Sequence, residues 1–140
     1  MAYFGRKKPP TILIVEDEAI VRLELVSRFE DLGMVVLAAA DADEAIVLLD
    51  GHPDIELLLT DIKMPGSMDG IRLAHHVRDR WPPVKIIVLS GLRNTRATQL
   101  PVESTLLSKP YDPDVLEQAM ARMLGGYVPP APGMRLRRRA

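Results

Sequence analysis

The sequence predicts an α/β domain in which helices cover both faces of an open, parallel, five-stranded sheet. Short apolar runs alternate along the chain with amphipathic stretches that carry helix start and stop signals. The first run is rich in β-branched residues and is followed at once by acids, which is typical of a parallel strand buried on both faces. Alternation of this kind indicates a doubly wound sheet.

The first strand is the run TILIV at residues 11–15. The first helix is expected from Ala19 to Leu32, with Gly33 after it as the C-cap. Apolar residues recur in this stretch at steps of three and four, which predicts a core-facing stripe of Ile20, Leu23, Val26, Phe29 and Leu32.

The second strand is MVVLAAA at 34–40, and the helix after it has a clear start signal. Asp41, with Glu44 three residues later, forms a capping box. The helix is expected to run through Leu49, and Gly51 stops it.

The third strand is IELLLT at 55–60, and a third helix is expected from about Gly70 to Trp81. The spacing predicts that its inward residues are Ile71, Ala74, His75 and Val77.

The fourth strand is VKIIVLS at 84–90, and STLLS at 104–108 is a shorter fifth. Between them, RNTRATQLP at 93–101 has weak apolar periodicity and ends in proline, so the fourth helix should be short or irregular. The last helix begins with Asp112 as N-cap and Pro113 at its first position.

Three segments are therefore expected: a basic N-terminal arm at 1–10, one domain at 11–124, and a flexible tail rich in Pro and Arg at 125–140. Seven of the 18 Lys and Arg residues lie in the two ends, whereas all 19 acids lie between them, so the body carries a net charge of −8. That charge disfavours nucleic-acid binding by the domain. The tail is too short for an effector domain, which favours a stand-alone domain.

Composition also narrows the kind of protein and its place in the cell. The chain has 140 residues, 47% of them hydrophobic, and no cysteine, which excludes disulfides. No apolar run has the roughly 18 residues that a membrane-spanning helix needs. The N-terminus does not resemble a secretory signal, so a cytoplasmic protein is expected.

Polar side chains follow the strands at the sheet edge where ligands bind in doubly wound folds. Glu16 and Asp17 follow the first strand, Asp61 the third, Ser90 ends the fourth, and Lys109 follows the fifth. Singly, the acids could begin a helix or form a turn. Five polar residues at matching strand ends favour a single binding site. That site should hold a cation, because clustered carboxylates repel one another without one and Mg²⁺ prefers oxygen ligands.

This pattern resembles the receiver domains of two-component response regulators, which have a flavodoxin-like fold. The resemblance covers about residues 11–124 and rests on VED (15–17), DIKMP (61–65), DG (69–70), LSG (89–91) and KPY (109–111).

The resemblance implies a role for each matched residue. Asp61 would be the phosphoacceptor, and the ligands of Mg²⁺ (or Mn²⁺) would be Asp17, Asp61, Glu16 largely through water, and the backbone carbonyl of Lys63. Ser90 and Lys109 would bind the phosphoryl group, and the Lys109–Pro110 peptide bond would be cis. Leu106 replaces the aromatic residue that reports phosphorylation in most receivers.

The resemblance also implies a signalling switch rather than an enzyme. A sensor histidine kinase or phosphotransfer protein would phosphorylate Asp61, and the altered surface would bind another protein or a second copy of the chain. A phosphate sink or phosphorelay intermediate stays an alternative. A Mg²⁺-dependent aspartyl-phosphate phosphatase is disfavoured, since Lys63 stands where such enzymes usually have a second acid.

Overall fold

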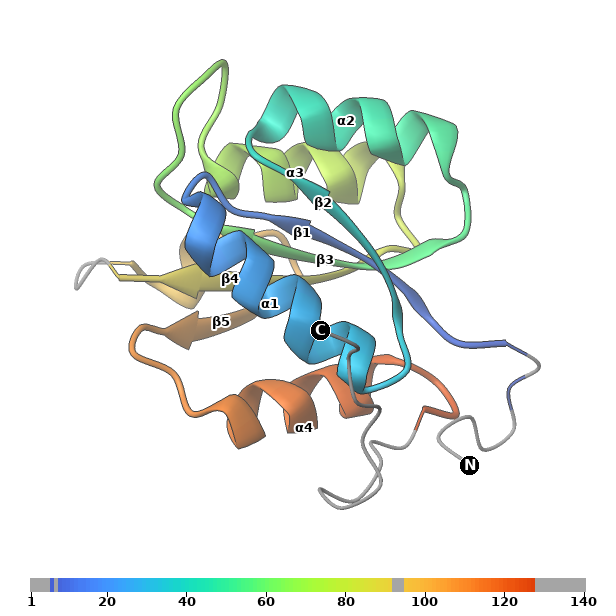
Figure 1. Cartoon of the computed structure of the whole chain (residues 1–140). Helices are drawn as coiled ribbons and strands as arrows, with labels where there is room; N and C mark the ends of the chain where they lie inside the picture. Colours follow the sequence, from blue (N-terminus) through green and yellow to red (C-terminus); the bar gives the residue numbers. More distant parts are fainter. Residues whose placement is uncertain (1–5, 7, 92–94, 128–140) are drawn as a thin grey trace.

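The computed structural model describes residues 6, 8–91 and 95–127. The strands are β1 (Thr11–Val15), β2 (Val35–Ala39), β3 (Ile55–Asp61), β4 (Lys85–Ser90) and β5 (Thr105–Ser108). The helices are α1 (Ala19–Asp31), α2 (Ala42–Gly51), α3 (Gly70–Arg80), the single 3-10 turn η1 (Ala97–Gln99) and α4 (Pro113–Met123) (Figure 1).

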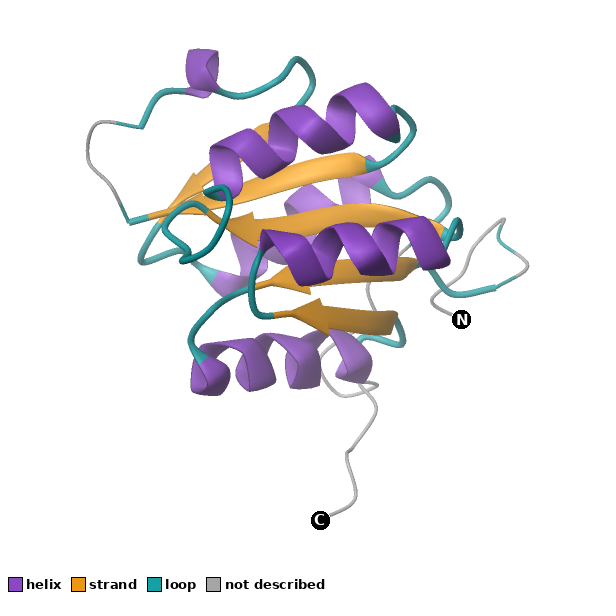
Figure 2. Cartoon of the chain, turned by 90° about the horizontal axis from the view of Figure 1, so that it is seen from above, coloured by secondary structure: helices purple, strands orange, loops and turns teal. Residues whose placement is uncertain are grey.

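The sheet is doubly wound, as the sequence predicts. All four strand pairings are parallel, and the order across the sheet is β2-β1-β3-β4-β5. The order reverses at β1, so the chain winds outward in both directions from the centre. In Figure 2 the strand arrows point toward the same edge, which brings the polar residues at the strand ends together.

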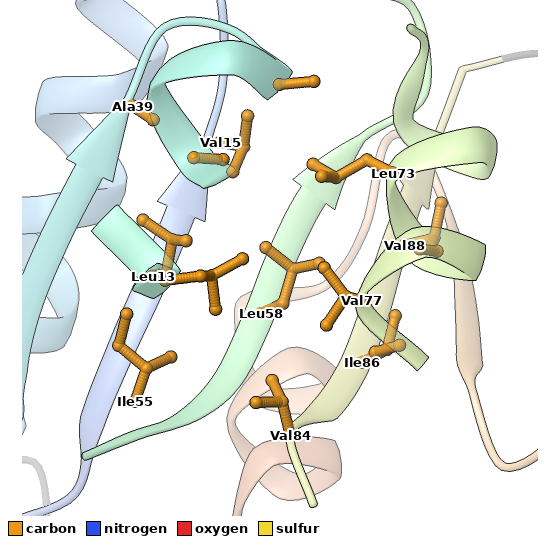
Figure 3. Packing of buried hydrophobic residues seen from close by; sticks show 14 of the residues in the cluster. Leu13, Val15, Ala39, Ile55, Leu58, Leu73, Val77, Val84, Ile86 and Val88 are labelled. Atoms are coloured by element: carbon orange, nitrogen blue, oxygen red, sulfur yellow. The ribbon is translucent and has the colours of Figure 1, made fainter. Parts of the chain in front are cut away.

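Two apolar clusters hold the helices to the sheet, one on each face. On one face α2 and α3 pack on Leu13, Leu58 and Val88, which Figure 3 shows pointing toward the helices. On the other face α1 and α4 pack on residues such as Ile14 and Leu59. The apolar residues of the central strands β1, β3 and β4 are almost all fully buried on both faces, which explains why these strands read as continuous apolar runs.

Both expected N-caps are present, although the Glu44 carboxylate accepts from the Ala40 N–H at 2.9 Å and not from the Asp41 N–H, as the expected capping box requires. The Asp41 carboxylate accepts a hydrogen bond from the Glu44 N–H at 2.9 Å, and the Asp112 carboxylate accepts one from the Asp114 N–H at 2.8 Å. Each bond satisfies an N–H of the first helical turn that has no carbonyl partner within the helix. These local contacts position α2 and α4 as the sequence predicts.

The buried stripe of α1 differs from the expected one. Ile20 and Leu23 are 74% and 65% exposed, whereas Leu25 and Phe29 are buried. Apolar residues at several overlapping three- and four-residue spacings occur in this helix, and periodicity alone does not select among them. Phe29 and Leu32 are buried as expected. Packing against the sheet buries Leu25 in place of Ile20 and Leu23.

The expected inward face of α3 is also partly wrong. His75 is exposed, and Leu73 is fully buried in its place. Leu73, Ala74 and Val77 form the buried stripe together with Gly70. The imidazole therefore faces the segment between β4 and β5 instead of the core.

That segment is irregular, as predicted from 93–101. Within its described part, from Thr95 onward, the structure has one 3-10 turn in place of a regular helix; residues 92–94 lie outside the described residues.

Among the residues that the structure describes, no helix is both long and apolar enough to cross a membrane.

The domain extends slightly beyond Leu124. Tyr127 is only 4% exposed, and its hydroxyl donates to the Leu32 carbonyl oxygen at 3.1 Å. The Arg6 guanidinium donates to the Gly125 carbonyl oxygen at 2.6 Å and pairs with the Glu56 carboxylate. The tail expected from residue 125 is thus packed through Tyr127, and its Arg cluster lies outside the described residues.

Candidate functional site

Three carboxylates meet at the carboxyl ends of β1 and β3. Glu16, Asp17 and Asp61 each offer an oxygen, and these oxygens all lie within 4.8 Å of one another. Glu16 is buried, Asp61 is half-buried and Asp17 is exposed. The sheet order explains the cluster, because β1 and β3 are hydrogen-bonded neighbours.

The Glu16 carboxyl has an unusual environment. Its Oε1 accepts a hydrogen bond from the Glu18 N–H at 3.2 Å, whereas its buried Oε2 has no hydrogen-bond partner among the described residues. Burial, followed by the charge of Asp61, raises the pKa of Glu16 to about 7. A buried oxygen without a donor and a carboxyl that resists ionisation both indicate a place for a cation.

Lys109 supplies a positive charge beside the carboxylates. Its Nζ lies 3.0 Å from Asp61 Oδ2 and 3.8 Å from Glu16 Oε2. Burial lowers the pKa of Lys109, but the hydrogen bond to Asp61 and the charges of Asp61 and Glu16 outweigh it, so the net shift is upward. Lys109 therefore stays protonated and partly neutralises the cluster.

The backbone around Lys109 is anchored to the neighbouring strand. The Lys109 N–H donates to the Ser90 carbonyl oxygen at 2.7 Å, and the Lys109–Pro110 peptide bond is cis. The hydrogen bond to Ser90 places the lysine at the edge where β3 and β4 end.

The Ser90 side chain is buried, at 2% exposed, and its hydroxyl donates to Thr95 Oγ1 at 2.9 Å. Sequence reasoning missed Thr95, since a threonine in an irregular segment carries no signal of its own. Only the return of the chain toward β4 brings the two hydroxyls together.

The backbone next to Asp61 is held by a close approach at Gly70. A Cβ at Gly70 would lie 1.9 Å from the Asp61 carbonyl oxygen, and the Gly70 N–H donates to the Ile62 carbonyl oxygen at 2.8 Å. The Ile62 N–H in turn donates to Asp61 Oδ1 at 2.9 Å. Glycine at position 70 thus allows the start of α3 to pack against the strand that carries Asp61.

Two further predicted residues are Lys63 and Leu106. The Lys63 side chain is exposed, in the loop after Asp61. Leu106 on β5 is half-buried and packs against the cluster beneath α3. The aliphatic side chain at position 106 is thus part of the packing on that face.

The residues present fit a hard divalent cation. The three clustered groups are carboxylates, the donors that Mg²⁺ prefers, and one of their buried oxygens lacks a hydrogen-bond donor. Asp17 is exposed, so solvent reaches the site and water can complete the coordination of such an ion.

Comparisons with known proteins agree with this arrangement. A family model described as the response regulator receiver domain matches residues 12–121. The Regulator of RpoS from Escherichia coli strain K12 is 41% identical over 106 residues. That match covers 72% of this chain but 31% of the regulator, so this chain spans about a third of its length.

Solved structures give the same result for the fold. The signal receiver domain of an HD domain-containing protein from Pseudomonas fluorescens Pf-5 has a TM-score of 0.76 and 25% identity, covering 83% of this chain and 94% of that chain. Response regulator TrrA from Thermotoga maritima was solved in complex with Mg²⁺ and BeF. It has a TM-score of 0.72 and 25% identity, and the match covers 82% of this chain and 99% of that chain.

Proposed function

Because this chain belongs to the response regulator receiver domain family, we propose that it is a phosphorylation-activated signalling switch with Asp61 as the phosphoacceptor. The observation that carries the proposal is the position of the Asp61 carboxylate. It lies within 4.8 Å of two other carboxylates and has the Lys109 ammonium 3.0 Å from its Oδ2. An acyl phosphate formed there would have a cation site on one side and a fixed ammonium on the other.

The transfer itself is a displacement at phosphorus. A carboxylate oxygen of Asp61 attacks the phosphorus of a phosphohistidine, a P–O bond forms, and the P–N bond of the donor breaks. The electron pair of that bond stays on the departing imidazole nitrogen. The product is an aspartyl phosphate, a covalent intermediate of the kind that carboxylate nucleophiles form.

The metal would be held by Glu16, Asp17 and Asp61, together with the backbone carbonyl of Lys63. When bound, Mg²⁺ supplies positive charge that stabilises the transferred phosphoryl oxygens. The chain's own contribution is to gather three carboxylates at 4.8 Å or less and to keep one oxygen of Glu16 without a hydrogen-bond donor.

Lys109 and Ser90 would bind the transferred group from the β4 and β5 side. The Lys109 ammonium, now 3.0 Å from Asp61 Oδ2, would pair with a phosphoryl oxygen once Asp61 is phosphorylated. The Ser90 hydroxyl would donate to another phosphoryl oxygen. Both residues stabilise charge that develops during transfer, which is the usual contribution of fixed donors at phosphoryl-transfer sites.

The phosphoryl donor would be a sensor histidine kinase or a phosphotransfer protein, and the output would be a protein–protein contact. In this role the chain assists its own phosphorylation and turns over no external substrate. A partner that binds only the phosphorylated form would separate an output switch from a phosphate sink.

Mass spectrometry after incubation with acetyl phosphate and Mg²⁺ tests the proposal. The chain should gain one hydroxylamine-labile phosphoryl group, and Asp61→Asn should gain none. Asp54→Asn is a matched control, because Asp54 is an exposed aspartate at the opposite end of β3. Phosphorylation of Asp61→Asn equal to that of the unmodified chain would contradict the assignment.

A further inference from the structure

A hydrogen bond between two hydroxyls joins the end of β4 to the segment that leads to β5. Ser90 Oγ, at the end of β4, donates to Thr95 Oγ1 at 2.9 Å. A serine hydroxyl has a single hydrogen to donate. In the proposed function that hydrogen is needed by a phosphoryl oxygen on Asp61, so Thr95 and the phosphoryl group compete for it.

We propose that Thr95 is a positioning residue that restrains Ser90 in the unphosphorylated protein, and that phosphorylation of Asp61 breaks this restraint. The proposal rests on the proposed function, since it requires a phosphoryl group at Asp61. When the Ser90 hydroxyl turns to donate to the phosphoryl oxygen, Thr95 loses its hydrogen bond to β4. The chain beginning at Thr95 then changes conformation.

The far end of the same segment is fixed to α3. His75 Nε2 is hydrogen-bonded to the Gln99 carbonyl oxygen at 2.8 Å, and Arg78 Nε donates to the Val102 carbonyl oxygen at 3.2 Å. The Arg78 guanidinium also donates to the Pro82 and Val84 carbonyl oxygens, at 2.8 and 3.1 Å. Arg78 is therefore itself held in place. The segment remains attached to α3 at Gln99 and Val102 when Thr95 is released from Ser90.

Core packing reinforces this fixed end. Leu100 is 7% exposed and belongs to the cluster beneath α3, against which Leu106 also packs. The conformational change is thereby confined to the stretch between Thr95 and Leu100. This route to the surface needs no aromatic ring at position 106, because the hydroxyl contact carries the signal directly into the backbone.

Residues 96–99 lie between the two ends and are all exposed. They include η1, whose hydrogen bonds join the Gln99 N–H to the Arg96 carbonyl oxygen at 3.0 Å and the Leu100 N–H to the Ala97 carbonyl oxygen at 3.1 Å. A short 3-10 turn has few bonds to lose. This turn is therefore the surface on which a partner would recognise the phosphorylated form.

Beryllofluoride with Mg²⁺, a non-covalent mimic of the phosphoryl group, provides the test. Thr95→Val keeps the shape of the side chain but removes the hydroxyl, so Ser90 no longer has that acceptor. Thr95→Val should bind beryllofluoride about fivefold more tightly than the unmodified chain by calorimetric titration, which corresponds to about 1 kcal/mol. Thr95→Ser should restore the original Kd.

Thr105→Val is the matched control, because it makes the same chemical change at a half-buried threonine on β5, and its Kd should equal that of the unmodified chain. An unchanged or weaker affinity in Thr95→Val would overturn the proposal. If the unmodified chain itself binds no beryllofluoride in the presence of Mg²⁺, the proposed function fails and the role of Thr95 fails with it.

Hydrogen exchange gives a second measurement, made on the unmodified chain and on Thr95→Val. Beryllofluoride should accelerate exchange of the Gln99 and Leu100 amides in the unmodified chain. In Thr95→Val these amides should already exchange fast without the ligand. Ligand binding that leaves both amides equally protected would show that Thr95 does not transmit the signal.

Discussion

Replacing Glu16 by glutamine should stabilise the metal-free protein. In the absence of a cation, the buried Glu16 carboxylate faces Asp61 and lacks a hydrogen-bond donor at Oε2. Glutamine has nearly the same shape and carries no charge. The substitution therefore removes the unfavourable ionisation without leaving a cavity.

The size and the pH dependence follow from the raised pKa. Each pKa unit corresponds to about 1.4 kcal/mol, so a change from 4.5 to about 7 amounts to about 3 kcal/mol. Below pH 4.5 the carboxyl is protonated in both states, and the variant should gain little. As the pH rises toward 7, the unfolded chain ionises freely while the folded chain resists, so the unmodified protein loses stability relative to the variant.

Urea unfolding in EDTA at pH 5 and pH 8 measures this difference. Glu16→Gln should be more stable than the unmodified chain by about 3 kcal/mol at pH 8 and by much less at pH 5. Glu18→Gln is the control, because its side chain is exposed and its replacement should change the unfolding free energy little at either pH.

Adding Mg²⁺ should reverse the order. A ligand that binds only the folded state stabilises it according to its concentration relative to Kd. The unmodified chain should therefore gain more from Mg²⁺ than Glu16→Gln, which lacks one carboxylate of the cluster. A metal-free Glu16→Gln protein that is no more stable than the unmodified chain at pH 8, or a difference independent of pH, would refute the reasoning.

Two further substitutions test the site's geometry. Gly70→Ala places a Cβ 1.9 Å from the Asp61 carbonyl oxygen, and the backbone shift should cost about 2 kcal/mol or more in the unfolding free energy. Gly51→Ala, where nothing lies within 4 Å, should be neutral or slightly stabilising, and equal effects of the two would contradict the close approach. Lys109→Met removes the ammonium 3.0 Å from Asp61, so Mg²⁺ should bind roughly tenfold more tightly in calorimetric titration while phosphorylation by acetyl phosphate slows. Unchanged Mg²⁺ affinity would show that the ammonium does not oppose the cation.

The sequence by itself determined the elements and the residues at their ends. Apolar runs such as TILIV and IELLLT must be buried, and Asp112 followed by Pro113 is a local start signal for a helix. Such signals depend on neighbouring residues alone, so they can be recognised without the fold. The same is true of the five polar residues that follow the strands.

Only the tertiary structure decided which helix stripe is buried. Ile20 and Leu23 satisfy the helical period, yet both are exposed, whereas Leu25, which lies outside the predicted stripe, is buried. The choice depends on where the helix lies on the sheet. A single-chain pattern contains no information on that position when several apolar stripes overlap.

The electrostatics of the site also required the tertiary structure. Lys109 and Asp61 are 48 residues apart in sequence, and their separation of 3.0 Å results from the strand order. The burial of Glu16 and the contact between Ser90 and Thr95 likewise depend on chain segments that meet only in the folded protein. Sequence specifies which groups stand at the strand ends, whereas their distances and desolvation, and hence their pKa values, arise from packing.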